Sequence, residues 1–237
     1  MTTPFEPLFP DVYADDNPCD WSAFAAAGPP WSGAILKATQ GTTYSSGEWL
    51  KTNWLALATA HASHGTIRGA YHYAQLAQSG KAQALFYLQT VAAAGGFKPG
   101  DLWPIVDVES ADNTGITAAQ AEDCIGEFAA TILAEIGRET MMYGGSLPYD
   151  LGITSRMGCS WLWFPRYTAT LPANTYERIG WSLDALFGWQ YKGAGGTALL
   201  ETPSGVLYPN DAPGCGNVDL TVLTLPGGLP GLVAALA

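Results

Sequence analysis

Short apolar runs alternate with helical patterns along the first two thirds of the chain. Apolar runs bounded by turn residues predict strands over residues 9–13, 33–38, 67–73, 102–109 and 140–143. Apolar residues at helical spacing predict helices over residues 21–27, 47–63 and 81–94, and a short irregular helix near 147–157. A further helix is predicted to begin at the capping box of Thr117 and Gln120 and to end at Gly137.

The pattern changes after residue 160. Three more strands are predicted over residues 161–165, 186–191 and 217–220, and the loops between them are rich in Gly, Pro and Thr. Strands that alternate with helices imply a parallel sheet, and eight strands are enough to close a barrel. We therefore predict an α/β fold: a single incomplete TIM-like barrel of the (β/α)5β3 type over residues 1–225. A C-terminal tail over residues 226–237 is expected to pack outside the barrel.

Two carboxylates, Asp107 and Glu109, stand at the end of a very apolar strand. Side chains alternate between the two faces of a strand, so the i, i+2 spacing points both acids the same way. Closely spaced acids push their pKa values apart, which keeps one of them protonated near neutral pH, as general acid catalysis on a glycosidic bond requires. Asp11 and Asp219 end the first and last predicted strands, and strand ends meet at one mouth of a barrel. The alternative is a strand end that dips into solvent.

Composition and charge exclude several classes of function. Only 13% of the 237 residues are charged, and 21 acidic against 10 basic side chains give a net charge of −11. Such a surface repels phosphate backbones, so no nucleic acid partner is expected. No apolar stretch is long enough to span a membrane, and the first ten residues resemble no signal peptide. We expect a monomer that is made in the cytoplasm and does not insert into membranes.

No metal or other cofactor is expected. The four cysteines, Cys19, Cys124, Cys159 and Cys215, are scattered without a C-x-x-C pair, and free buried thiols are the favoured interpretation. A disulfide between Cys19 and Cys215 is the alternative, because the first and last strands of a closed barrel are neighbours. His61 and His64 share a helix face, but no third metal ligand is indicated.

A series of short motifs follows in order between about residues 9 and 222. They are Asp11-Val12-Tyr13, Cys19-Asp20-Trp21, Leu36-Lys37-Ala38-Thr39-Gln40-Gly41, Gly69-Ala70-Tyr71-His72-Tyr73, Asp107-Val108-Glu109, Met141-Met142-Tyr143, Leu162-Trp163-Phe164-Pro165-Arg166-Tyr167, Trp189-Gln190-Tyr191 and Val218-Asp219. Together they resemble the motifs of the family 25 glycoside hydrolases, the muramidases or lysozymes of bacteria and phages. The incomplete barrel of that family agrees with the strand count above.

The resemblance implies cleavage of the β-1,4 bond between N-acetylmuramic acid and N-acetylglucosamine in cell-wall peptidoglycan. It implies that Glu109 is the general acid, that Asp107 assists it, and that Asp219 and Asp11 complete an acidic mouth. The substrate-binding residues would be Tyr71, Tyr143, Trp163, Trp189 and Gln190, although the aromatic ones could equally fill the barrel. Action on the wall outside the cell is implied, after release at lysis of a phage-infected cell or after export by another route.

Three positions depart from the family pattern. Gln40 stands where Glu is frequent, Tyr13 where a small hydroxyl residue is usual, and Pro165 where Ala is usual. Gln40 removes a charge near the mouth but keeps hydrogen-bonding capacity, and Tyr13 could narrow the cleft. Gln40 and Tyr13 leave open one alternative, a barrel that binds wall glycan in a larger assembly without turnover. The other alternative is a glycosidase that acts on chitin or another N-acetylated polymer, because the chemistry of a carboxylic acid with an acetamido group is shared.

Overall fold

The computed structural model describes residues 6–16, 18–168, 175–193, 196 and 208–237, and inside helix α2 it leaves out the side chains of residues 61, 63 and 64. Its strands are β1 (Leu8–Val12), β2 (Gly33–Gln40), β3 (Tyr44–Ser45), β4 (Ile67–Tyr73), β5 (Ile105–Val108), β6 (Met141–Gly144), β7 (Trp161–Pro165), β8 (Leu186–Lys192) and β9 (Asp219–Leu223). They form one sheet in the order β1-β9-β8-β7-β6-β5-β4-β2-β3, and pairing of β1 with β2 closes it. The predicted barrel is confirmed, with the two-residue β3 as an extra hairpin arm.

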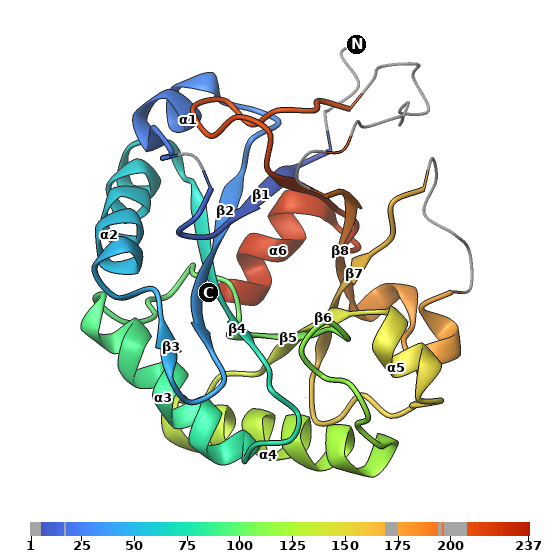
Figure 1. Cartoon of the computed structure of the whole chain (residues 1–237). Helices are drawn as coiled ribbons and strands as arrows, with labels where there is room; N and C mark the ends of the chain where they lie inside the picture. The colour runs from blue at the N-terminus through green and yellow to red at the C-terminus, as the bar shows by residue number, and fades with distance from the viewer. Residues whose placement is uncertain (1–5, 17, 169–174, 194–195, 197–207) are drawn as a thin grey trace.

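Four helices cover the part of the barrel wall where strands and helices alternate (Figure 1). They are α1 (Trp21–Ala27), α2 (Gly47–His64), α3 (Gly80–Ala93) and α4 (Ala118–Ile136). The predicted capping box of α4 is present, and Gly137 ends that helix in the left-handed conformation. In the described chain between β6 and β8 the helices are short: α5 (Ser146–Asp150), η1 (Glu177–Ile179) and η2 (Leu183–Ala185). Helix α5 is shorter than the predicted 147–157 because Gly152, at φ 68°, turns the chain away.

Two apolar clusters hold the barrel together. The outer one packs the helices against the outward faces of the strands, and Trp54 and Phe128 are among its fully buried members. The inner one fills the lower half of the barrel, where Phe9, Ile105 and Phe187 point inward. Apolar side chains thus fill one end of the interior, and the opposite end is free for polar groups.

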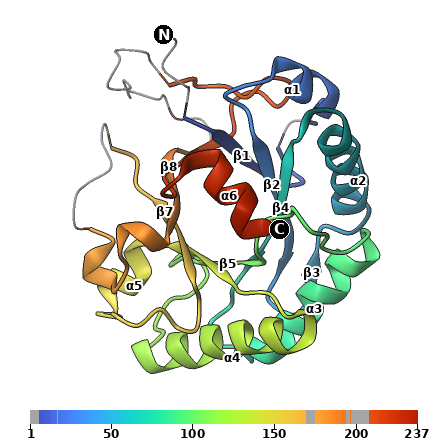
Figure 2. The same cartoon turned by 180° about the vertical axis from the view of Figure 1, so that it is seen from behind.

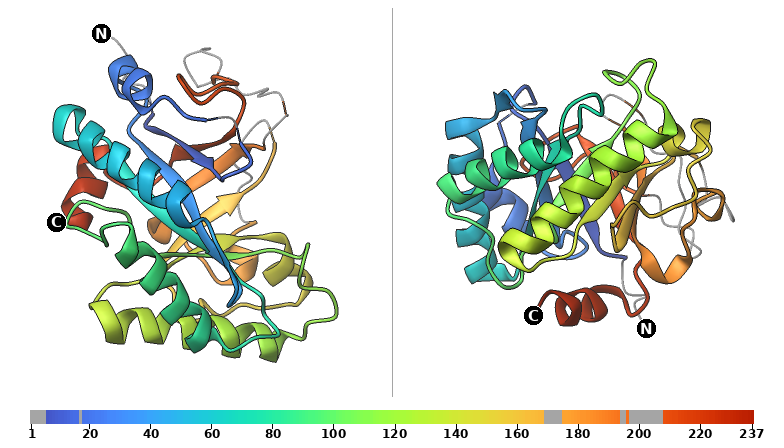
Figure 3. Two further views of the ribbon diagram at one scale, coloured as in Figure 1. Left: turned by 60° about the vertical axis from the view of Figure 1, so that its left-hand side comes forward. Right: turned by 90° about the horizontal axis from the view of Figure 1, so that it is seen from below.

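The C-terminal segment closes the apolar end. Residues 226–237 include helix α6 (Gly228–Leu236), which lies in front of the ring of strands when the molecule is seen from behind (Figure 2) and below the barrel in Figure 3. Its Leu232 and Leu236 join the inner cluster, and the Leu236 carbonyl accepts a hydrogen bond from Gly100. The expected tail therefore packs across the base of the barrel.

The last strand corrects the expectation of a parallel sheet. Strand β9 runs antiparallel to both β1 and β8, whereas the other neighbouring pairs among the main strands are parallel. The described residues between β8 and β9 contain no crossover helix, and β9 runs in the direction opposite to β8. Asp219 therefore begins the last strand instead of ending it. It reaches the predicted mouth because β9 enters the barrel from that end.

Candidate active site

The four predicted acids line one cavity at the polar end of the barrel. Asp11 comes from β1, Asp107 from β5, Glu109 from just beyond β5 and Asp219 from β9, around a space of about 200 Å³. Asp16 adds a fifth acid, and Lys37 from β2 is the one cation in the described lining. The closed barrel brings strand ends from three distant parts of the chain to one mouth, and the acids meet there.

Gln190 ties the cavity together from β8. Its amide Nε2 donates to Asp11 Oδ2 at 2.9 Å and to Asp219 Oδ2 at 3.4 Å. Its Oε1 accepts from the hydroxyls of Tyr143 and Tyr167, each at 2.8 Å. These four contacts use the amide's two donor hydrogens and both lone pairs of its oxygen. Gln190, expected to touch substrate, is therefore placed to position these acids and tyrosines.

Burial and mutual repulsion raise the pKa values of the acids. The pKa of Asp107 lies well above its ordinary value, chiefly because the side chain is buried and secondly because Glu109 is close. Its Oδ1 has no hydrogen-bond partner among the described residues. The pKa of Asp11 is raised well above its ordinary value too, by burial first and by Asp219 next, against the opposing hydrogen bond from Gln190. The cavity thus holds carboxyl groups that resist ionisation.

Glu109 is half-buried and lies where two cavities meet. Burial raises its pKa, while a hydrogen bond from Tyr143 and the charge of Lys37 oppose the rise. A carboxyl group that stays protonated and still faces open space can give its proton to a bound molecule. Of the four acids, Glu109 best meets both conditions.

Lys37 is a site residue that sequence reasoning missed. Its Nζ donates to Gln40 Oε1 at 2.9 Å and lies over the ring of Tyr73 at 5.0 Å from the centroid. Gln40 in turn donates to Asp112 at 2.8 Å, so the predicted hydrogen-bonding role of this departure is confirmed. Burial lowers the pKa of Lys37, and the nearby acids oppose that effect. The sequence does contain a signal for this residue. Lys37 stands two residues after Ile35 on a largely apolar strand, and this spacing places its side chain on the same inward face.

The four predicted aromatic residues divide into two groups. Tyr71, Tyr143 and Trp163 line the acidic cavity, although Trp163 is 2% exposed and donates its indole N–H to Thr221. Trp189 lines neither cavity: it belongs to the outer cluster and donates to the Arg166 carbonyl at 2.6 Å. The register of β8 shifts against β7 after Leu162, and this irregularity accompanies the inward turn of Gln190.

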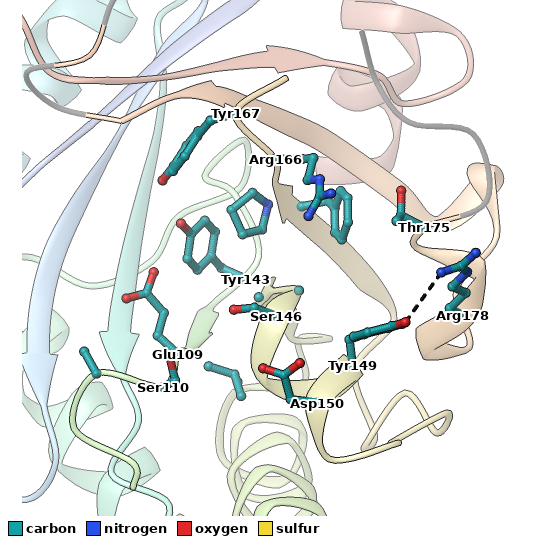
Figure 4. A pocket seen from close by; sticks show the side chains of 16 residues that line it. Glu109, Ser110, Tyr143, Ser146, Tyr149, Asp150, Arg166, Tyr167, Thr175 and Arg178 are labelled. Atoms are coloured by element: carbon teal, nitrogen blue, oxygen red, sulfur yellow. Dashed lines mark hydrogen bonds between the residues drawn. The ribbon is translucent and has the colours of Figure 1, made fainter. Parts of the chain in front are cut away.

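A second, larger cavity adjoins the first. It measures about 550 Å³ and is bounded by the segment after β5, by α5, by the end of β7 and by η1. Glu109 and Tyr143 stand at one end of it, and Arg178 stands at the other (Figure 4). Pro165, the third departure, lines this cavity as well. A space of this size accommodates a sugar unit with a substituent.

Exposed tyrosines surround the two cavities, and the sequence did not distinguish them from buried ones. Tyr13 is 39% exposed, Tyr149 is 50% exposed and Tyr167 is 59% exposed, and each lines one of the two cavities. Flat rings with one free face are suited to stacking on sugar rings. These three are better placed for that contact than the buried Trp163 and Trp189.

Lys192 is a second missed residue. It is 2% exposed, and its ammonium donates to Asn217 Oδ1 at 2.8 Å and to the Val218 carbonyl at 2.9 Å. Both acceptors immediately precede Asp219. A buried cation therefore fixes the turn that presents this acid to the cavity.

The four cysteines and His72 lie outside the lining of both cavities. Among the described side chains no cluster of His, Cys, Asp or Glu could hold a metal ion, and the side chains of His61 and His64 lie outside the described part. All four cysteines are free thiols. His72 packs toward the helices, between Thr39 and Gln83, and burial lowers its pKa to about 4. No helix in the described chain is long and apolar enough to cross a membrane.

A barrel that gathers carboxyl groups with raised pKa values beside a sugar-sized cavity is typical of glycosidases. Comparison with known proteins gives the particular family. Residues 10–198 match the family model for glycosyl hydrolases family 25, and the chain belongs to this family.

Solved structures agree with this assignment. The bacterial lysozyme from Streptomyces coelicolor is 24% identical with a TM-score of 0.69, over 100% of this chain and 98% of that one. A muramidase from Trichobolus zukalii is 23% identical with a TM-score of 0.72, over 97% and 98% of the two chains. Likeness at this level of identity establishes the fold, and it confirms the barrel.

A curated relative is longer than this chain. The uncharacterized protein YegX of Escherichia coli strain K12 is 25% identical over 170 residues, which are 72% of this chain and 56% of YegX. The matched part of this chain therefore spans little more than half the length of that relative.

Proposed function

We propose that the protein is a muramidase of the lysozyme type. It cleaves the β-1,4 bond between N-acetylmuramic acid and N-acetylglucosamine in bacterial peptidoglycan. It acts as a monomer on the wall outside the cell, after release at lysis or after export. The observation that carries the proposal is the position of Glu109, a half-buried carboxyl group with a raised pKa at the junction of two cavities.

In this proposal the junction marks the bond that breaks. One sugar occupies the acidic cavity and the next unit of the chain occupies the larger cavity, so the glycosidic oxygen lies beside Glu109. Glu109 protonates that oxygen as it leaves and then activates the water that completes hydrolysis.

Asp107 is proposed to assist through the substrate's own acetamido group. Its buried Oδ1, which lacks a partner among the described residues, is available to accept the acetamido N–H. This contact would orient the acetamido oxygen for attack on the sugar carbon. Asp11 and Asp219 would stabilise the positive charge that develops on the sugar ring in the transition state.

A turbidity assay on purified peptidoglycan tests the proposal. The wild type should clear the suspension, and Glu109→Gln should clear it at least a hundredfold more slowly because the variant has no acidic proton. No clearing by the wild type would refute the muramidase assignment and leave a glycan-binding barrel. Clearing of chitin in preference to peptidoglycan would favour the alternative of a glycosidase that acts on chitin or another N-acetylated polymer.

The chemical route needs a separate test. Peptidoglycan whose sugars have been de-N-acetylated lacks the group that Asp107 is proposed to orient. Its hydrolysis should be at least a hundredfold slower than that of the acetylated glycan. Equal rates on the two glycans would contradict attack by the acetamido group and would favour an aspartate as the nucleophile.

A further inference from the structure

The larger cavity carries positive charge in a strongly acidic protein. The chain has five arginines, and two of them, Arg166 and Arg178, line this cavity. They reach it from two different elements, the end of β7 and η1 (Figure 4). This placement sets them apart from the rest of a chain whose net charge is −11.

The other three arginines are engaged by the fold itself. Arg68 forms a buried ion pair with Asp101 at 2.6 Å. Arg138 donates to two backbone carbonyls, and Arg156 donates to a backbone carbonyl and a serine hydroxyl. Each of these guanidinium groups therefore has a structural function.

Arg166 and Arg178 have no comparable engagement. Within the described residues neither forms an ion pair, and the guanidinium of Arg178 makes one long contact, 3.5 Å to the Tyr149 hydroxyl. Both side chains are exposed to the cavity. Asp150 lines the same space, yet it is paired with neither arginine. Two planar cations are thus free to bind an anion from outside.

A guanidinium matches a carboxylate through two parallel hydrogen bonds, which makes arginine selective for planar anions. Glu109 lines the same cavity, so an anion held there belongs to the molecule on which Glu109 acts. We propose that the larger cavity is an anion subsite, in which Arg166 and Arg178 bind a carboxylate carried by a muramic acid residue beside the cleaved bond. That carboxylate is on the peptide stem, or on the lactyl group of a muramic acid residue that carries no stem. The inference rests on the proposed function and adds a preference for acidic over neutral glycan.

Three soluble glycan substrates of equal length distinguish the sources of the anion. The first carries intact peptide stems, the second carries stems whose carboxyl groups have been amidated, and the third has its stems removed so that only lactyl carboxylates remain. Rates of glycan cleavage, as kcat/KM, are measured on each. The variants are Arg166→Gln and Arg178→Gln, with Arg178→Lys to keep the charge without the planar fork.

Lys51→Gln is the matched control. It changes the net charge by the same amount, but Lys51 lies on α2, where its partner is the exposed Glu48. Circular dichroism and thermal unfolding confirm that each variant is folded. Replacement of an exposed side chain should leave both unchanged.

The wild type should cleave intact strands about tenfold faster than amidated strands. In each glutamine variant kcat/KM should fall about tenfold on intact strands and change little on amidated strands. Lys51→Gln should have the same kcat/KM values as the wild type. A loss confined to intact strands assigns the stem carboxylates, and a loss confined to stripped strands assigns the lactyl carboxylate. A loss on both, but not on amidated strands, shows that the subsite accepts either carboxylate. Equal losses on all three substrates, or equal wild-type rates on all three, would overturn the subsite. Failure of the wild type on every substrate would instead refute the proposed function.

Discussion

Replacing Gln190 by methionine should disable the site while keeping the barrel filled. Methionine has nearly the same length and shape, but it removes the amide that joins two acids to two tyrosines. The side chain is 1% exposed, so water cannot readily replace the lost contacts. The experiment therefore isolates the contribution of four hydrogen bonds.

The loss of stability expected for Gln190→Met follows from the geometry of these four hydrogen bonds. The bond to the Asp11 carboxylate contributes about 2 kcal/mol, and the bond from the buried Tyr143 contributes about 1 kcal/mol. Tyr167 is 59% exposed and can bond to water instead, and the 3.4 Å contact with Asp219 is weak. The free energy of unfolding should fall by about 3 kcal/mol, which for a chain of this size lowers Tm by roughly 6–12 °C.

Activity should fall for an electrostatic reason. The Gln190 hydrogen bond lowers the pKa of Asp11, so its loss raises that pKa further and leaves Asp11 neutral at a higher pH. A neutral Asp11 cannot stabilise positive charge on the sugar, and kcat should drop by about tenfold or more. Thermal unfolding and turbidity assays across pH 5–7 measure both effects.

Gln190→Glu is the informative companion. It keeps an oxygen acceptor for the two tyrosines but places a third acid between Asp11 and Asp219, so its Tm should fall more steeply as pH rises. If Gln190→Met keeps kcat within twofold and Tm within 2 °C of the wild type, Gln190 does not organise the site and the reasoning is wrong.

Three further predictions concern titration. His72 has a pKa of about 4 in the folded protein against 6.5 in the unfolded chain, so the unfolded chain takes up the proton first as pH falls. The free energy of unfolding should therefore decrease by about 3 kcal/mol between pH 6.5 and 4. His72→Asn should flatten this pH dependence, as measured by denaturant titrations. Lys37 lowers the pKa of Glu109, so Lys37→Met should move the alkaline limb of the kcat/KM profile to higher pH, and an unmoved limb would contradict the coupling. Burial raises the pKa of Asp107, so ionisation of this side chain destabilises the folded protein as pH rises. Asp107→Asn should therefore have a higher Tm than the wild type at pH 7 but not below pH 3. The same variant should lose most of its activity.

The sequence predicted the parts of the molecule that local patterns control. Capping at Thr117, the stop at Gly137 and the alternation of apolar runs with helices all appear in the structure, because each depends on neighbours within one or two turns. The i, i+2 spacing put Asp107 and Glu109 on one cavity for the same reason.

Features that depend on distant contacts could not be predicted in this way. The direction of β9 depends on which neighbours accept it, and nothing within the strand distinguishes an antiparallel from a parallel partner. The contrasting roles of Trp189 and Gln190 follow from a register shift between β7 and β8 that simple alternation does not anticipate. The role of Lys192 depends on carbonyl groups more than twenty residues away.

The pairing of β1 with β9 also has a consequence for how the protein is made. Asp11 faces Asp219 across that pair, and more than 200 residues separate them in the chain. Contacts this distant form late, because the loop that they close is long and the ribosome delivers β9 after the other eight described strands. The nascent chain therefore has no complete acidic cavity until β9 has been synthesised. The pairing of β1 with β9 that completes the barrel also brings Asp11 and Asp219 together. Repulsion between these two acids therefore opposes the folding step that forms the site.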